Sequence, residues 1–81
     1  MFDEVRSVLS EALQLGSRGA NFTASTPLLG SIVELDSMAV VTVLTMLEER
    51  FGFSIDDDEI SAETFATVGT LTMFVEQKLS A

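Results

Sequence analysis

The chain has no cysteine and no histidine, and only four of its 81 residues are basic. Without cysteine it can form neither a disulfide framework nor a thiolate zinc site. Without histidine it lacks the usual general base of an enzyme. The four bases stand against 13 acids, so the net charge is −9. This balance argues against nucleic-acid binding, which needs a basic surface, and it favours partners with basic patches.

Long apolar runs are also missing. No stretch approaches the roughly 20 apolar residues that a membrane span needs. The first ten residues contain early acids and lack the apolar centre of a signal peptide, so a cytoplasmic protein is expected. The length predicts one domain over residues 1–81. Hydrophobic residues make up 47% of the chain, which suffices for a simple, well-patterned core.

The helical spacing of apolar residues predicts an all-α fold. The expected helices run from about Phe2 to Leu15, Ser37 to Phe51, Ser61 to Phe65 and Val68 to Leu79. The third is short, is capped by Ser61, and depends on packing for its stability. Gly16 and Gly52 can end the first two helices. Asp36 and Thr67 can cap the starts of the second and the last.

The connection from Gly16 to Asp36 shows no clear periodicity. A connection of this length indicates a functional loop, a crossover between helices that are not adjacent and antiparallel, or both. Four apolar residues of this connection are expected to pack across the helix ends; they are Pro27, Leu28, Leu29 and Ile32. Further on, the acidic run from Asp56 to Glu59 is predicted to be a solvated loop. It lacks the alternating acids, central glycine and closing glutamate of a calcium loop, and no metal site is expected.

The second predicted helix has apolar residues on more than one side. Its core face is expected to comprise Val40, Leu44, Leu47 and Phe51, flanked by Val43. Met38, Val41 and Met46 lie off that stripe. Two interpretations are open: the helix is buried on several sides, or it presents a partner surface. Methionine side chains suit the second interpretation, because they are flexible and polarizable and adapt to several surfaces.

Ser37 follows Asp36 directly and opens this helix. Its hydroxyl is expected to be exposed beside the free amides of a helix N-terminus, which favour an anion such as a phosphate ester. An Asp-Ser pair is also a common way to start a helix, so these two residues alone are a weak signal. A hydrolase using Ser37 is the least favoured reading, because the chain has no histidine to activate the hydroxyl and no lysine lies near it in sequence.

In the register around Asp36, Ser37 and Met38, the chain resembles the acyl carrier protein family along nearly its whole length. The stretch "VVTVLTMLEERFGFSI" is similar to the family's second helix and exit loop, and "ISAETFATVGTLTMFVEQKL" to its short third and last helices. The resemblance implies a small four-helix bundle with a long loop between helices 1 and 2 and a short third helix.

The resemblance also implies the chemistry of the site. Ser37 would be esterified with 4′-phosphopantetheine, which a phosphopantetheinyl transferase takes from coenzyme A. The thiol of this arm would hold an acyl group as a thioester, and Asp36 would help to present Ser37. An acyl cavity is implied as well, and we expect its walls to be Val43, Leu44, Leu47, Ile60, Phe65 and Leu71.

The expected docking surface consists of Met38, Val41, Met46 and Glu49, with Glu48 at its edge. It would meet acyl-transferring or acyl-activating enzymes with basic patches. Ala39 and Thr42 stand where fatty-acid-synthase carriers usually have acids, and Arg50 stands where a third glutamate is common. These departures favour a dedicated pathway, such as lipid-modifying, polyketide-like or cell-surface polymer synthesis.

Three classes of function compete. The first is an acyl carrier that is not an enzyme and acts as a monomer in a fatty-acid, lipid or polyketide-like pathway. The second is an aminoacyl or peptidyl carrier that uses the same serine. The third is an unmodified helical adaptor. The acidic balance of the chain favours acyl cargo over aminoacyl cargo.

Overall fold

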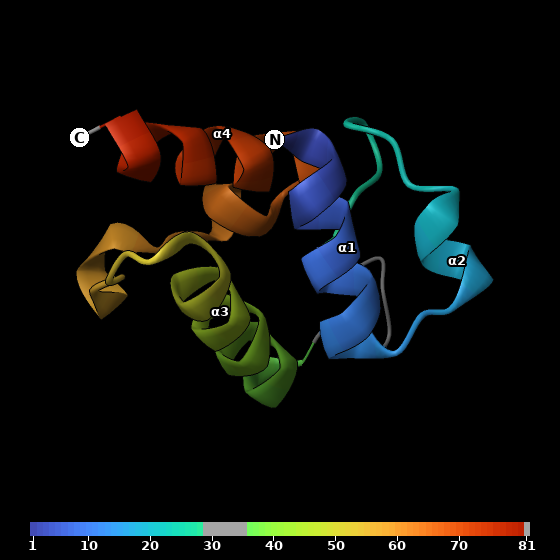
Figure 1. Ribbon diagram of the computed structural model, residues 1–81, viewed down its shortest axis with the longest axis horizontal. Helices are drawn as coiled ribbons and strands as arrows, with labels where there is room; N and C mark the ends of the chain where they lie inside the picture. Colours follow the sequence, from blue (N-terminus) through green and yellow to red (C-terminus); the bar gives the residue numbers. More distant parts are fainter. Residues whose placement is uncertain (29–35, 81) are drawn as a thin grey trace.

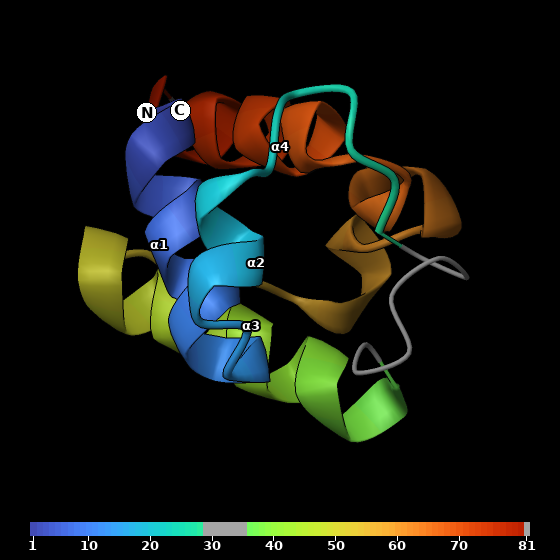
Figure 2. The ribbon, with the colours of Figure 1, turned by 90° about the vertical axis from the view of Figure 1, so that its right-hand side faces the viewer.

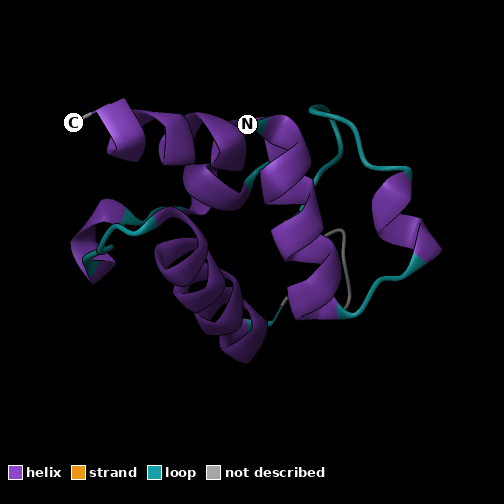
Figure 3. Cartoon of the chain, viewed as in Figure 1, coloured by secondary structure: helices purple, strands orange, loops and turns teal. Residues whose placement is uncertain are grey.

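The computed structural model describes residues 1–28 and 36–80, and these residues are mostly helical (Figure 3). The elements are α1 (Phe2–Leu13), α2 (Ser17–Ala20), α3 (Ser37–Phe51), the 3₁₀ turns η1 (Asp57–Glu59) and η2 (Ala62–Phe65), and α4 (Val68–Ser80). Within the described residues there is no strand beyond an isolated bridge between Pro27 and Thr67. The predicted all-α bundle is confirmed, and its short third helix is η2.

The helices surround one core. α1 contacts α2, α3 and α4, and η2 packs on α4. α1 begins beside α4 and runs away from it towards α3, while α2 lies on the outer side of α1 (Figure 1). The fully or almost fully buried apolar residues are Val5, Val8, Leu9, Leu13, Leu15, Leu28, Val43, Leu47, Phe65, Val68, Leu71 and Val75. Every long helix therefore supplies one apolar stripe to the same cluster, as the helical spacing predicts.

The end of α1 differs from the prediction. The helix was expected to reach Leu15 and stop at Gly16, but it ends at Leu13, and Gln14 takes the left-handed conformation with φ 54°. The amide of Leu15 donates to the Ser10 carbonyl oxygen at 3.0 Å, which closes a Schellman-type turn. This turn places Leu15 in the core. Gly16, with φ 59°, instead precedes the one-turn helix α2, which the periodicity did not reveal.

The core face of α3 is rotated from the predicted one. Val43, expected only at its flank, is fully buried together with Leu47, whereas Val40, Leu44 and Phe51 are partly buried. The buried face of α3 is thus centred on Val43 and Leu47, which are four residues apart and lie on one side of the helix. The helical spacing of Val68, Leu71, Val75 and Leu79 predicts one apolar stripe along α4, but the buried face ends at Val75, and Leu79 is 43% exposed.

Residues 21–28, the described part of the connection between α2 and α3, are anchored to the start of α4 (Figure 2). The carbonyl oxygens of Thr26 and Ala24 accept hydrogen bonds from the amides of Val68 (3.0 Å) and Gly69 (2.8 Å). These bonds satisfy amides that a helix start leaves without an intrahelical partner. Gly69 permits this approach, since a Cβ there would lie 2.9 Å from the Ala24 oxygen. The cap by Thr67 is confirmed, because its Oγ1 accepts from the Thr70 amide at 3.1 Å.

Part of this loop packs on the core, as predicted. Leu28 is fully buried, and its amide donates to the Ala66 carbonyl oxygen at 3.0 Å. Pro27 is exposed and forms the bridge with Thr67. Leu29 and Ile32 lie outside the described residues.

Candidate functional site

Asp36 fixes the start of α3. Its backbone is extended, with φ −98° and ψ −175°, and its side chain turns back over the first helical turn. Oδ1 accepts a hydrogen bond from the Ala39 amide at 2.8 Å, and its carbonyl oxygen accepts from the Val40 amide at 2.9 Å. The predicted N-cap is therefore confirmed. It sets the point at which the helix begins, and hence the position of the next residue, Ser37.

Ser37 is exposed and is the first residue of the 15-residue helix α3. The first amides of a helix have no intrahelical partner, and the helix dipole places partial positive charge there. A phosphate ester on the Ser37 hydroxyl would lie in this favourable environment. The exposed hydroxyl can also be reached by a modifying enzyme. The residues at the start of α3 therefore fit a phosphopantetheine group.

Asp36→Ala is expected to lower the free energy of unfolding by about 1 kcal/mol, because it removes the cap of α3. Asp36→Asn keeps a side-chain oxygen at the same place and should cost much less. Denaturant unfolding of the two variants measures the difference. Equal losses would show that the charge of Asp36, and not its cap hydrogen bond, stabilises the helix start.

The residues predicted for the docking surface do not all share one exposed face. Met38 is 74% exposed, Val41 is 58% exposed, and Glu49 is exposed too. Met46 is partly buried and packs against the core. Glu48 is also partly buried, and its Oε2 accepts a hydrogen bond from the Ile55 amide at 2.7 Å. The freely accessible part of the surface is therefore Met38, Val41 and Glu49.

The residues predicted for the acyl cavity do come together. Val43, Leu47, Phe65 and Leu71 belong to the buried core, and Leu44 and Ile60 are partly buried against it. They come from α3, from η2 and Ile60 just before it, and from α4. An acyl chain that enters between these residues would have to part the three elements. η2 is the shortest of the three, with four residues.

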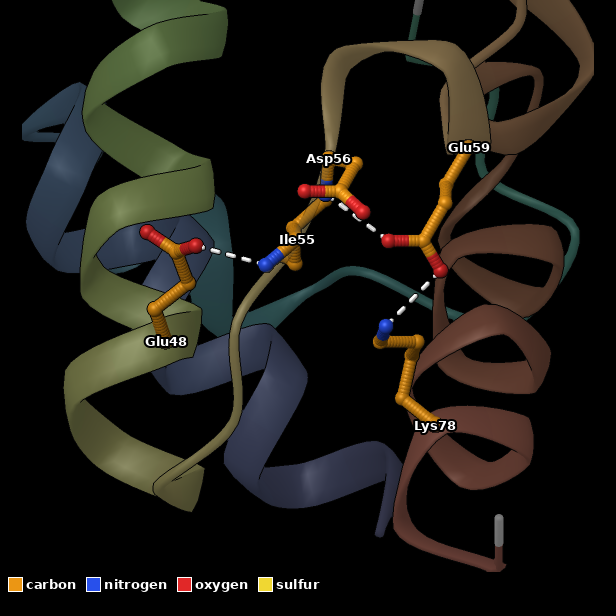
Figure 4. Close-up of polar contacts among 5 residues, drawn as sticks. All are labelled: Glu48, Ile55, Asp56, Glu59 and Lys78. Carbon is orange, nitrogen blue, oxygen red and sulfur yellow. Dashed lines mark hydrogen bonds and ion pairs between the residues drawn. The ribbon is translucent and has the colours of Figure 1, made fainter.

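Carboxylates hold the segment between α3 and η2, a feature that the sequence did not reveal (Figure 4). Besides the Glu48–Ile55 bond, Glu59 Oε2 accepts from the Asp56 amide and Glu59 Oε1 pairs with Lys78 Nζ, both at 2.7 Å. The Asp56 amide and then the Lys78 ammonium lower the pKa of Glu59 below its ordinary value. Part of the predicted solvated acidic run is thus tied to α4. The feature of the sequence that could have indicated this ion pair is Lys78, one of only four basic residues.

In the part of the chain that the structure describes, no group of three or more acidic, cysteine or histidine residues is arranged to hold a metal ion. None of the described helices combines the length and the apolar character that crossing a membrane requires.

Comparison with known proteins places the chain in a family. The family model described as "Phosphopantetheine attachment site" matches residues 3–75. Acyl carrier proteins of Thermotoga maritima and Sulfurovum sp. are 30% and 35% identical, over 98% and 94% of this chain and 91% and 95% of their own lengths. The solution NMR structure of a holo acyl carrier protein from Nitrosomonas europaea is 60% identical, with a TM-score of 0.91 over 99% of this chain and 96% of that one. The chain therefore belongs to the acyl carrier protein family of phosphopantetheine-bearing carriers.

Proposed function

We propose that Ser37 is the residue that carries 4′-phosphopantetheine, and that the protein shuttles acyl intermediates between enzymes of a fatty-acid, lipid or polyketide-like pathway. The exposed position of Ser37 at the start of α3, directly after the Asp36 cap, carries this proposal. When bound, the group supplies a thiol that holds the acyl chain as a thioester. The chain's own contribution is positional: Asp36 orders the helix start, and the helix start stabilises the ester phosphate.

The chemical steps belong to partner enzymes, so the chain itself is not assigned an enzymatic activity. The partners are a phosphopantetheinyl transferase and acyl-transferring or acyl-activating enzymes with basic patches, which complement the net charge of −9. The proposal places the protein in the cytoplasm as a single-domain monomer. An aminoacyl carrier would use the same serine, and the acidic balance favours acyl cargo over it.

The proposed docking surface is Met38, Val41 and Glu49, with smaller contributions from Met46 and Glu48. Its centre is apolar, because Ala39 and Thr42 supply no acid near the start of α3. Arg50, further along, pairs with Glu11 of α1 at 3.4 Å, so this base serves the bundle itself. This surface is less acidic and more apolar than expected for a fatty-acid-synthase carrier, which supports a carrier dedicated to a specialised pathway.

Met38→Ala is expected to weaken docking, because a side chain that is 74% exposed can be buried by a partner. We expect about a fivefold rise in the KM of a broad-specificity phosphopantetheinyl transferase for the unmodified protein, which corresponds to roughly 1 kcal/mol. Met73→Ala, which truncates a methionine that is 58% exposed on α4, is the matched control. The association rate should also fall as salt rises, since charge steers encounter. An unchanged KM for Met38→Ala would place the docking surface elsewhere.

Acyl loading is expected to stabilise the bundle in proportion to chain length. Each methylene that the core buries contributes roughly 0.8 kcal/mol, and cargo that binds only the folded state shifts the unfolding equilibrium. Thermal unfolding of the unmodified, pantetheinylated and acyl-loaded forms measures this effect. A Tm that does not depend on chain length would mean that the cargo stays in solvent, and would favour the aminoacyl-carrier alternative.

A further inference from the structure

The segment between α3 and η2 forms one side of the region in which the predicted cavity residues meet. Phe53, Ile55 and Ile60 are partly buried and pack against the core cluster that contains Leu47 and Phe65. The Phe53 ring also stacks on Phe51 at the end of α3, with 6.0 Å between the ring centroids. Whatever fixes this segment therefore fixes part of the wall around the proposed cargo site.

Two neighbouring backbone amides of the segment are each bound by a carboxylate (Figure 4). Glu48 of α3 accepts from the Ile55 amide at 2.7 Å, and Glu59 of η1 accepts from the Asp56 amide at 2.7 Å. The second carboxylate is itself tied to α4, because Glu59 Oε1 lies 2.7 Å from Lys78 Nζ. The amides of Ile55 and Asp56 are thus held between α3 on one side and α4 on the other.

The segment has little regular structure to hold it otherwise. Between Gly52 and η2 the only element is η1, a turn of three residues. Backbone amides near a core need hydrogen-bond partners, and bonds to ionised carboxylates are shorter and stronger than bonds between neutral groups. The two carboxylates therefore restrain the amides of Ile55 and Asp56, and the Asp56 carbonyl oxygen also accepts a hydrogen bond from the Glu59 amide at 3.0 Å.

We propose that Glu48 and Glu59 act together as a carboxylate clip that holds Ile55 and Asp56 in place and so sets how tightly the cargo region encloses an acyl chain. The part concerning cargo rests on the proposed function. In this assignment Glu48 is a positioning residue, and its neighbour Glu49 supplies the docking charge at this end of α3. The clip gives the two adjacent glutamates different roles, although their sequence context is alike.

Two substitutions at position 48 separate the effect of the charge from the effect of the hydrogen bond. A glutamine at position 48 keeps a carbonyl oxygen that can accept from the Ile55 amide but removes the charge. An alanine removes both. Glu76→Ala is the control, because it removes one charge from an exposed acid of α4 that lies outside the docking surface and whose side chain makes no hydrogen bond or ion pair among the described residues.

Hydrogen exchange of the unmodified protein, followed amide by amide by NMR, tests the clip without any cargo. Glu48→Ala should reduce the protection of the Ile55 amide about tenfold, as the loss of one charged hydrogen bond implies. Glu48→Gln should retain most of the protection, and Glu76→Ala should retain all of it. Glu59→Ala should have the same effect on the Asp56 amide, with Glu63→Ala, an exposed acid of η2, as its control. Unchanged protection of Ile55 in Glu48→Ala would overturn the clip.

The acyl-loaded forms test the consequence for cargo. In Glu48→Ala the rise in Tm with acyl chain length should be smaller than in the wild type, and spontaneous hydrolysis of the thioester should be faster. Glu48→Gln and Glu76→Ala should behave like the wild type. If all variants load at Ser37 and the chain-length dependence is the same in each, the clip does not control enclosure. If the wild type fails to load, the proposed function fails, while the exchange experiment still decides whether the clip exists.

Discussion

Ser37→Ala is expected to abolish loading completely. With coenzyme A, magnesium and a broad-specificity phosphopantetheinyl transferase, the wild type should gain one pantetheine phosphate group and the variant none, as intact mass shows. The reason is that Ser37 places an exposed hydroxyl at the amide-rich start of α3, directly after the Asp36 cap. Ser54→Ala, another exposed serine, is the control and should load as the wild type does.

The fold should survive this substitution. Ser37 follows the capping residue, so removing its hydroxyl should cost at most about 1 kcal/mol of unfolding free energy. Circular dichroism and thermal unfolding check that the variant is folded when it fails to load. Full modification of a folded Ser37→Ala protein would show that another hydroxyl is the attachment site.

Leu47→Ala is expected to be the most destabilising single change in α3. Leu47 is fully buried and belongs to the central cluster, so its truncation leaves a cavity and should cost roughly 2–5 kcal/mol. In a chain of this size that loss should lower Tm by at least about 10 °C. Met38→Ala on the same helix should change stability by less than about 0.5 kcal/mol, since Met38 is 74% exposed.

Denaturant unfolding of both variants separates the core face of α3 from its outer face. If Met38→Ala destabilises the protein as much as Leu47→Ala does, then Met38 is part of the core and the proposed docking surface is misplaced. A small loss for Leu47→Ala would instead mean that the bundle relaxes around the missing side chain.

The helices and their caps could be predicted because their signals are local. Asp36 and Gly52 stand directly before and after α3, and each does what was expected of it. The Asp36 carboxylate accepts a hydrogen bond from the Ala39 amide, and Gly52 takes the left-handed conformation with φ 75°. The start of α4 is equally local, since Thr67 caps the Thr70 amide. Such contacts need only neighbouring residues, so the sequence contains the whole of their cause.

The remaining features depend on residues far apart in the chain. Val43, and not Val40 or Leu44, is at the centre of the buried face of α3, because the elements that surround the helix decide which face is buried. Gln14 ended α1 early because the turn that it makes places Leu15 in the core. The bonds from Glu48 to Ile55 and from Glu59 to Lys78 likewise need the folded arrangement of α3, η1 and α4.

In the candidate site, too, the features with a local cause could be predicted, and those that depend on distant residues could not. The identity of the family came from the register of whole segments around Ser37, and the position of Ser37 followed from the cap. The docking residues were harder to predict, because a helical projection cannot tell how far neighbouring elements cover Met46 and Glu48. Both side chains lie off the expected core stripe, and both are partly buried.

Intact mass of the protein purified from its native host, with the modified peptide mapped, tests the central claim most directly. We expect one 4′-phosphopantetheine group per chain, bare or acylated, on the peptide that contains Ser37 and on that residue alone. An unmodified protein under conditions in which other carriers of the host are loaded, or a group attached to a different residue, would contradict the assignment of Ser37 as the attachment site.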